Sequence, residues 1–225
     1  AEFPVLAALV DHKLKELDYK LAVSHEVEFI GYNHPDGKRT YLRSLCFVLQ
    51  NAVRRIYPDK VLIINHSLPS GLYCTICEKE PLEDGRRAVH ELDDKALAEL
   101  KEEMRNIVSA DLPFTKVKME AAAAEELFLA NGQPDKAALL KSLGVLICSV
   151  YYLDGQADTF HGPLLPSTGY LKVFDLMPYG EGFCLQFPSD NDFNKVIPVR
   201  KQSRIASTLM DYADWCSIIG VNGIG

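Results

Sequence analysis

The segment DTFHGPLLP, residues 158–166, carries the residue types of a small catalytic or ligand-binding turn. Asp158 and His161 supply a carboxylate and an imidazole three positions apart, and such a pair can act as a general base with its orienting partner. Gly162 and Pro163 predict a tight turn that would hold both groups in place. A site at this turn is therefore the first functional hypothesis.

Two further positions of the same segment weaken a catalytic interpretation. Phe160 and Leu164 flank the Gly-Pro turn, and both are hydrocarbon. A zinc centre needs three or four nitrogen, sulfur or oxygen ligands held together, and neither side chain can provide one. The segment is thus a working site, a former site or a purely structural turn.

Other metal and redox motifs are weak in this chain. Cys74 and Cys77 have the two-thiol spacing of zinc and redox sites, but no second pair follows and both fall in a predicted strand. Residues three apart in a strand point to opposite faces, so the two sulfur atoms would not meet one ion. No histidine pair has HxH or HxxxH spacing. We therefore expect no metal site.

Phosphate-binding and nucleophile motifs are missing as well. Neither a GxxxxGK[ST] loop nor a GxSxG elbow occurs in the sequence. Arg43 is predicted one helical turn before Phe47, where it would form either an anion clamp or a partly buried structural ion pair. His66 is predicted in a turn between two strands, where a ligand could approach.

The composition predicts a folded, acidic protein. The chain has 225 residues, of which 48% are hydrophobic and 24% charged, enough to bury a core. Its net charge of −7 opposes strong, non-specific nucleic-acid binding. Cysteines within apolar runs favour a reducing, cytoplasmic location, and no run is long enough to span a membrane. The sequence at both ends suggests a piece of a longer protein.

The periodicity of apolar residues predicts an α+β fold in which an antiparallel sheet packs against helices. Residues 1–36 are expected to form a small β-rich unit, followed by a turn at PDG, residues 35–37, and a helix from Thr40 to Tyr57. The other expected elements are a hairpin with strands 61–66 and 72–77; helices at 91–111, 120–132, 134–144 and 202–219; and strands at 113–119, 146–153, 157–160, 169–175 and 182–187.

In order, these motifs resemble a known arrangement. Residues 41–187 resemble the editing domain that threonyl-tRNA synthetase shares with alanyl-tRNA synthetase, and residues 4–38 resemble the latter half of a TGS β-grasp module. The landmarks are RRIYP, HSLPSGLYCTI, ELDDKALAELKEEMRNIV and DTFHGPLLPSTGYLKVFDL. The resemblance implies domains at 1–38 (partial TGS-like) and 39–200 (editing-like), with a helix and linker at 201–225.

The resemblance also locates what has changed. The synthetase family carries an HxxxH pair on the first long helix, and a cysteine and a histidine around the later Gly-Pro. Here the helix pair falls on Arg43 and Phe47, and the loop pair on Phe160 and Leu164. All four donors are replaced, so the resemblance implies an editing-like domain without its metal or its hydrolytic centre.

A second resemblance concerns the parent protein. The stretches DGKRTYLRSL, HSLPSGLYC and FHGPLLPSTGYLKVFDLMPYGEGFCLQFP are similar to the amino-terminal region of bacterial uridine kinase-like proteins. There, such a segment precedes a P-loop nucleoside kinase domain, a transferase that binds ATP and Mg²⁺. The resemblance implies those cofactors only for a kinase domain beyond Gly225 of the same polypeptide, and none for this chain.

The resulting prediction is a non-catalytic accessory segment that binds a small polar ligand or, more weakly, a tRNA end. Two alternatives stay open: a metal-independent aminoacyl-tRNA deacylase that uses Asp158 and His161, and a structural oligomerisation module of unknown oligomeric state. The expected pocket lies between the first long helix and the 158–169 loop. Its predicted lining is Arg43, Phe47, His66, Tyr73, Asp158, Phe160, His161, Gly162, Pro163 and Leu164.

Overall fold

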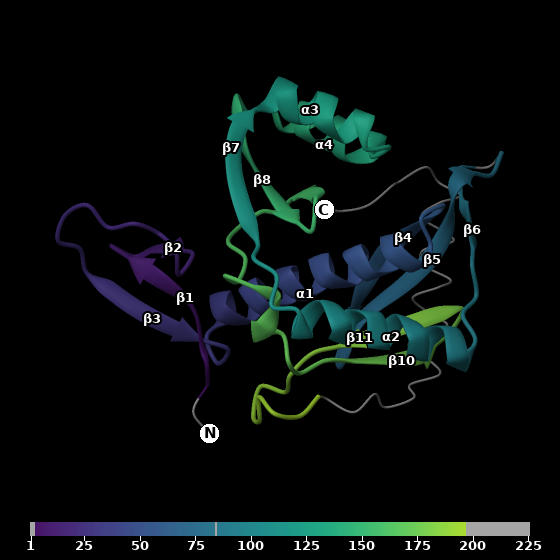
Figure 1. The fold of residues 1–225 in the computed structure, drawn as a ribbon, viewed down its shortest axis with the longest axis horizontal. Coiled ribbons are helices and arrows are strands. Elements are labelled where there is room, and N and C mark those ends of the chain that lie inside the picture. The colour runs from purple at the N-terminus through teal and green to yellow at the C-terminus, as the bar shows by residue number, and fades with distance from the viewer. Residues whose placement is uncertain (1–2, 84, 197–225) are drawn as a thin grey trace.

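A computed structural model describes residues 3–83 and 85–196 of the chain. Within this part, four α-helices pack against three antiparallel sheets, which confirms the predicted α+β class (Figure 1). The elements in chain order are β1 (Val5–Val10), β2 (Lys13–Lys15), β3 (Val27–Gly31), α1 (Pro35–Ile56), β4 (Lys60–Leu68), β5 (Gly71–Pro81), β6 (Arg87–Val89), α2 (Asp94–Ser109), β7 (Thr115–Glu120), α3 (Ala121–Ala130), α4 (Pro134–Leu143), β8 (Ile147–Leu153), β9 (Gln156–Thr159), a 3-10 turn (Thr168–Tyr170), β10 (Asp175–Tyr179) and β11 (Gly182–Gln186).

The predicted β-rich unit at the beginning of the chain is a three-stranded sheet in the order β2-β1-β3. Asp11 and His12 form the two-residue hairpin turn between β1 and β2, with φ angles of 47° and 61°. Such left-handed angles match the twist of a hairpin, and Asp tolerates them better than most residues. Asp11 is held by His25, whose ring nitrogen lies 2.6 Å from its carboxylate.

The beginning of α1 corrects one prediction. PDG, residues 35–37, is the first turn of the helix and not a separate turn, so α1 begins five residues before Thr40. His34 caps the helix by accepting a hydrogen bond from the Asp36 amide at 3.2 Å, and proline fits the first turn because its missing N–H would be unpaired there. Gly37 allows the helix to touch β3, since a Cβ there would lie 2.0 Å from the Gly31 carbonyl oxygen.

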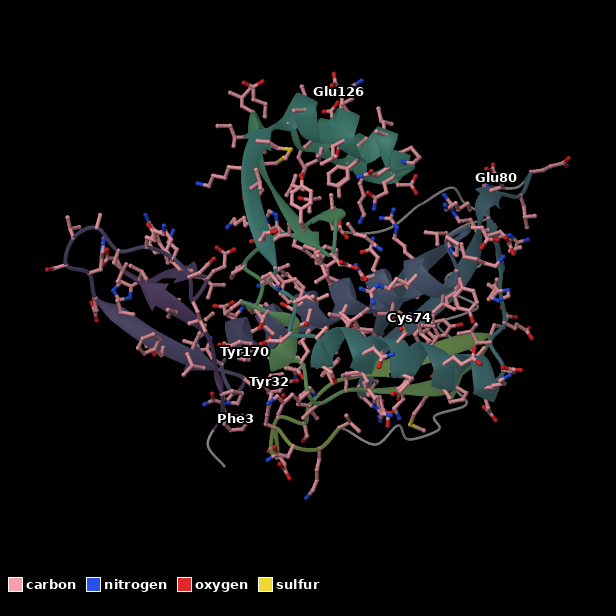
Figure 2. The ribbon with its side chains drawn as sticks, in the orientation of Figure 1. Phe3, Tyr32, Cys74, Glu80, Glu126 and Tyr170 are labelled. Atoms are coloured by element: carbon pink, nitrogen blue, oxygen red, sulfur yellow. The ribbon has the colours of Figure 1, made fainter. Side chains whose placement is uncertain are left out.

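The central sheet is five-stranded, with β10-β11-β5-β4 in order and β6 also paired to β5. The predicted hairpin is confirmed and is longer at both ends, covering β4 and β5. Alternate residues of β5, Leu72, Cys74 and Ile76, join α1 and α2 in one hydrophobic core. Figure 2 shows Cys74 inside this layer, whereas Glu80 lies near the outer end of β5.

The third sheet, β7-β8-β9, carries α3 and α4 on one face. Phe128 of α3 and Leu140 of α4 pack with Val150 of β8 and Ala157 of β9 in a second, smaller core. Gly144, with φ of 61°, ends α4 in a left-handed conformation, as its sequence predicts. The opposite face of β8 presents Tyr151 to the main core.

The predicted strand at 169–175 is wrong. Thr168 begins a 3-10 turn because its hydroxyl donates to the Ile107 carbonyl at 2.8 Å and accepts from the Leu112 amide at 2.9 Å. These bonds fasten the chain to the end of α2, and an extended conformation returns only at Asp175, where β10 pairs with β11. The predicted helix at 202–219 lies outside the described residues.

Among the described helices, none combines the length and the apolar character that crossing a membrane requires.

Candidate functional site

The 160–166 loop is fastened to α1 by hydrogen bonds from two helical residues. Arg43 donates from Nε to the Pro163 carbonyl at 3.1 Å and from Nη2 to the Thr40 hydroxyl at 3.1 Å. Ser44 Oγ accepts the Leu165 amide at 2.9 Å. Partial burial lowers the pKa of the Arg43 guanidinium from its usual value. In place of the predicted structural ion pair, the described residues give Arg43 hydrogen bonds to a backbone carbonyl of the loop and to a hydroxyl of its own helix.

The positions that the resemblance assigns to metal donors form a hydrophobic plug, which we define as Phe47, Phe160 and Leu164. Phe47 and Leu164 are each 1% exposed. The Phe47 ring centroid lies 5.2 Å from that of Phe160 and 5.9 Å from that of Phe114. These spacings are those of packed aromatic pairs, so side chains fill the space between α1 and the loop.

Gly162 is the residue that lets the loop reach Arg43. Its φ of 131° is a conformation that side chains other than hydrogen rarely permit, and a Cβ at this position would lie 2.9 Å from the Arg43 guanidinium carbon. The Gly162 carbonyl oxygen lies 3.2 Å from the Tyr151 hydroxyl oxygen. The packing of the loop on Arg43 thus gives the Gly-Pro turn a structural reason.

Asp158 is occupied by partners other than His161. It is 4% exposed and forms an ion pair with Lys136 of α4. Its carboxylate also accepts the Thr159 amide at 2.7 Å. Burial lowers the pKa of Lys136, and the Asp158 charge opposes that shift. The ion pair therefore joins α4 to β9 rather than leaving Asp158 free as a base.

His161 is exposed on the loop. Within the described part of the chain, no hydrogen bond or ion pair joins its ring to Asp158. The geometry therefore gives the metal-independent deacylase no assembled base and orienter.

His66 and Tyr73 lie elsewhere. His66 is in β4 and not in the predicted turn, and its ring packs at a tilt against that of Tyr73 in β5, with centroids 5.2 Å apart, beside Tyr179 and Cys184. This face is opposite to the one that packs on α1, because Tyr73 alternates with Leu72 and Cys74 of the main core. Burial lowers the pKa of His66 and raises that of Tyr73. The prediction that His66 and Tyr73 line a pocket with the 158–169 loop is therefore wrong.

Metal-binding side chains are scattered in the described residues, where no group of three or more His, Cys, Asp or Glu is close enough to hold an ion. Cys74 and Cys77 are free and buried. Cys77 contacts the Thr75 hydroxyl at 3.6 Å, whereas Cys74 belongs to the main core on the other face of β5. Their opposite orientation follows from the strand, as the spacing indicates.

Sequence reasoning missed a groove on the outer side of the loop. We call it the lysine groove; it has a volume of about 530 Å³ and lies between β2 with its following loop and the β7–β8 face. Phe160, Gly162 and Pro163 line one wall. Two sequence features could have indicated the groove: the alternating lysines of TKVKM, residues 115–119, and the charged segment LKELDYK, residues 14–20. They are distant in the chain, and only the fold brings them together. The groove's polar and aromatic lining includes Lys15, Tyr19, Lys20, Lys116, Lys118 and Tyr151.

A larger cavity, of about 870 Å³, lies between the end of α2 and the 3-10 turn, beside Tyr170 (Figure 2). Its charges are balanced internally. Arg105 lies 3.5 Å from Glu102, and Asp111 accepts the Gly169 amide at 3.0 Å. This cavity shows no net charge or cluster of unpaired groups that would select a ligand.

No protein-family model matches the chain. Its curated relatives are threonine–tRNA ligases. The ligase of Desulforamulus reducens is 31% identical over 173 residues, which are 76% of this chain and 26% of the ligase. That of Carboxydothermus hydrogenoformans is 28% identical over 173 residues, with 76% and 26% covered. That of Halorhodospira halophila is 29% identical over 168 residues, with 74% and 25% covered.

The chain thus spans about a quarter of the length of the curated relatives it matches. The similarity covers three quarters of this chain, and it confirms the coarser part of the predicted resemblance, a threonyl-tRNA synthetase-like domain with an α+β fold. These relatives lend no support to the predicted link with uridine kinase.

Proposed function

We propose that this chain is a non-catalytic accessory domain, an editing-type domain in which a hydrophobic plug replaces the hydrolytic centre. One observation carries the proposal: the four positions that would supply metal donors hold one arginine bonded to backbone oxygen and three packed hydrocarbon side chains. Hydrocarbon cannot ligate zinc or activate water. The fold is kept because the same four residues now connect α1 to the loop.

The attachment of this domain to a nucleoside kinase, with ATP and Mg²⁺ bound by that kinase, is a further part of the proposal and rests on the motif resemblance alone. An accessory domain of this kind would act on its parent by binding a small polar ligand or a tRNA end. Because the plug leaves no room between α1 and the loop, any such ligand would have to bind on the outer surface.

The proposal is tested by measuring zinc content and deacylation of serine-charged tRNA for the chain, with the matching segment of the Desulforamulus reducens ligase measured in parallel. We expect substoichiometric zinc and no release of serine above the uncatalysed rate. His161→Ala and Asp158→Asn variants are expected to leave that rate unchanged. Stoichiometric zinc bound at the loop, or a deacylation rate that falls in the His161→Ala variant, would contradict the proposal.

A further inference from the structure

The lysine groove contains more cations than its own acids neutralise. Lys116 pairs with Glu16 at 2.9 Å, and Glu16 also accepts a hydrogen bond from the Tyr151 hydroxyl. No ion pair of the described residues includes the other three lysines, and Asp18 is the only remaining acid of the groove. Three ammonium groups therefore face one carboxylate across this small space. The three lysines are Lys15, Lys20 and Lys118.

The Glu16 contacts also fix the groove's shape. Glu16 follows β2, whereas Lys116 and Tyr151 belong to β7 and β8, so this three-residue contact joins the first sheet to the third. The Tyr151 hydroxyl oxygen also lies 3.2 Å from the Gly162 carbonyl oxygen, so the contact reaches the loop. The Glu16 contacts thus hold the end of β2 against β7 and β8 and define the two walls of the groove.

An aromatic ring lies at the groove beside the unpaired cations. Tyr19 is 45% exposed, and the Lys15 ammonium lies 4.5 Å from its ring centroid. An exposed ring of this kind provides a surface on which a nucleobase can stack, and neighbouring lysines bind phosphate oxygens. The exposed ring would therefore contact the base of a nucleotide, and the lysines would contact its phosphate.

The size and charge of the groove select a small ligand over a polymer. Its volume of about 530 Å³ lies within the range of small-molecule sites, roughly 300–1,000 Å³. The net charge of −7 on the whole chain would repel an extended polyanion, whereas a single nucleotide meets only the local lysines.

We propose that the lysine groove is a binding site for a single nucleoside phosphate, with the phosphate held by Lys20 and Lys118 and the base stacked on Tyr19. This assignment goes beyond the accessory role and is independent of whether the loop catalyses a reaction. If the zinc and deacylation tests contradicted the accessory role, the nucleotide site would be unaffected. If no nucleotide bound, the accessory role would be unaffected.

The test is isothermal titration of the chain with uridine 5′-monophosphate, ATP, pyrophosphate and uridine. We expect both nucleotides to bind, with an affinity that falls as salt is added, and uridine to bind at least about tenfold more weakly, the loss expected when a charge-assisted contact is missing. Equal affinity for uridine and its monophosphate, or no binding of any phosphate probe at millimolar concentration, would overturn the proposal.

Matched variants locate the site. Lys20→Ala and Lys118→Ala should each weaken nucleotide binding about tenfold. Lys95→Ala, at an 85% exposed lysine side chain on α2, removes the same charge elsewhere and should leave the affinity unchanged. Tyr19→Ala should weaken nucleotide binding but not pyrophosphate binding. An equal loss in the Lys95 variant would overturn the assignment, as would far tighter binding of a single-stranded RNA oligomer than of either nucleotide.

Discussion

The two sides of the 160–163 loop differ in what they contact. On the inner side, Phe160 packs against Phe47, and the space next to α1 is filled with hydrocarbon. On the outer side, the same residues line a groove whose other walls carry lysines and tyrosines. One loop thus separates a dry core from a charged surface.

Under the proposed function, this difference accounts for an editing-type fold that persists without a hydrolytic centre. Replacing polar donors on the inner side by packed side chains adds buried apolar contacts, which stabilise the connection between α1 and the loop. Phe160 also lines the outer groove, but the lysines of that groove take no part in the replacement, because they come from β2, β7 and the chain after β2. Loss of one site and presence of a binding surface are therefore compatible.

The largest expected effect is at the inner side. Phe47→Ala should lower the free energy of unfolding by about 3–5 kcal/mol, since it leaves a cavity beneath Phe160 and Phe114. Phe29→Ala, at a residue that is 66% exposed, should change it by no more than about 0.5 kcal/mol. Urea denaturation measures both. A small loss for Phe47→Ala would mean that the inner side is an open pocket, and the comparison would fail.

The Asp158–Lys136 ion pair should produce the next largest effect. Lys136→Met leaves the buried Asp158 carboxylate without its partner and should destabilise the chain by roughly 3 kcal/mol. Lys141→Met, at an exposed lysine of the same helix, is the control and should have little effect. Adding Asp158→Asn should restore part of the lost stability. Equal losses in the two lysine variants would show that the pair does not join α4 to β9.

Gly162 tests the junction between the two sides. Gly162→Ala combines a strained φ with a clash against Arg43 and should cost about 2 kcal/mol. Gly132→Ala is a milder reference, because its φ of 68° lies in the left-handed region, where a side chain costs less, and its Cβ would have no neighbour within 4 Å. Thermal unfolding of both variants gives the difference, and no difference would show that neither the φ of 131° nor contact with Arg43 constrains the loop.

The smallest expected effect is the contribution of His66 to the pH dependence of stability, at a position away from the loop. Burial holds its folded pKa below the value of 6.5 expected for the unfolded chain, so the unfolded state binds more protons in that interval. Stability should consequently fall as the pH drops through and below 6.5. His66→Gln should lose less stability than the wild type over this range in urea titrations. Identical pH profiles of the two proteins would show that His66 is not buried beside Tyr73.

Local sequence features predicted much of the fold. The five inward positions of the second long helix, Leu97, Leu100, Met104, Ile107 and Val108, are all buried in α2. The predicted hairpin at 61–66 and 72–77 is also confirmed as β4 and β5, since a hairpin depends on neighbours in the chain. The beginning of α1 and the turn at Thr168 were misread, because a cap and a tertiary hydrogen bond decided them.

The sequence by itself determined that Phe47, Phe160 and Leu164 cannot bind a metal, since the identity of a side chain sets its chemistry. Only the tertiary structure decided that these residues meet in one packed cluster and that His66 and Tyr73 lie on another face. The lysine groove is likewise a tertiary feature, because its walls come from segments about 100 residues apart that Glu16 joins. Contacts of this kind depend on how sheets pack, which no short pattern records.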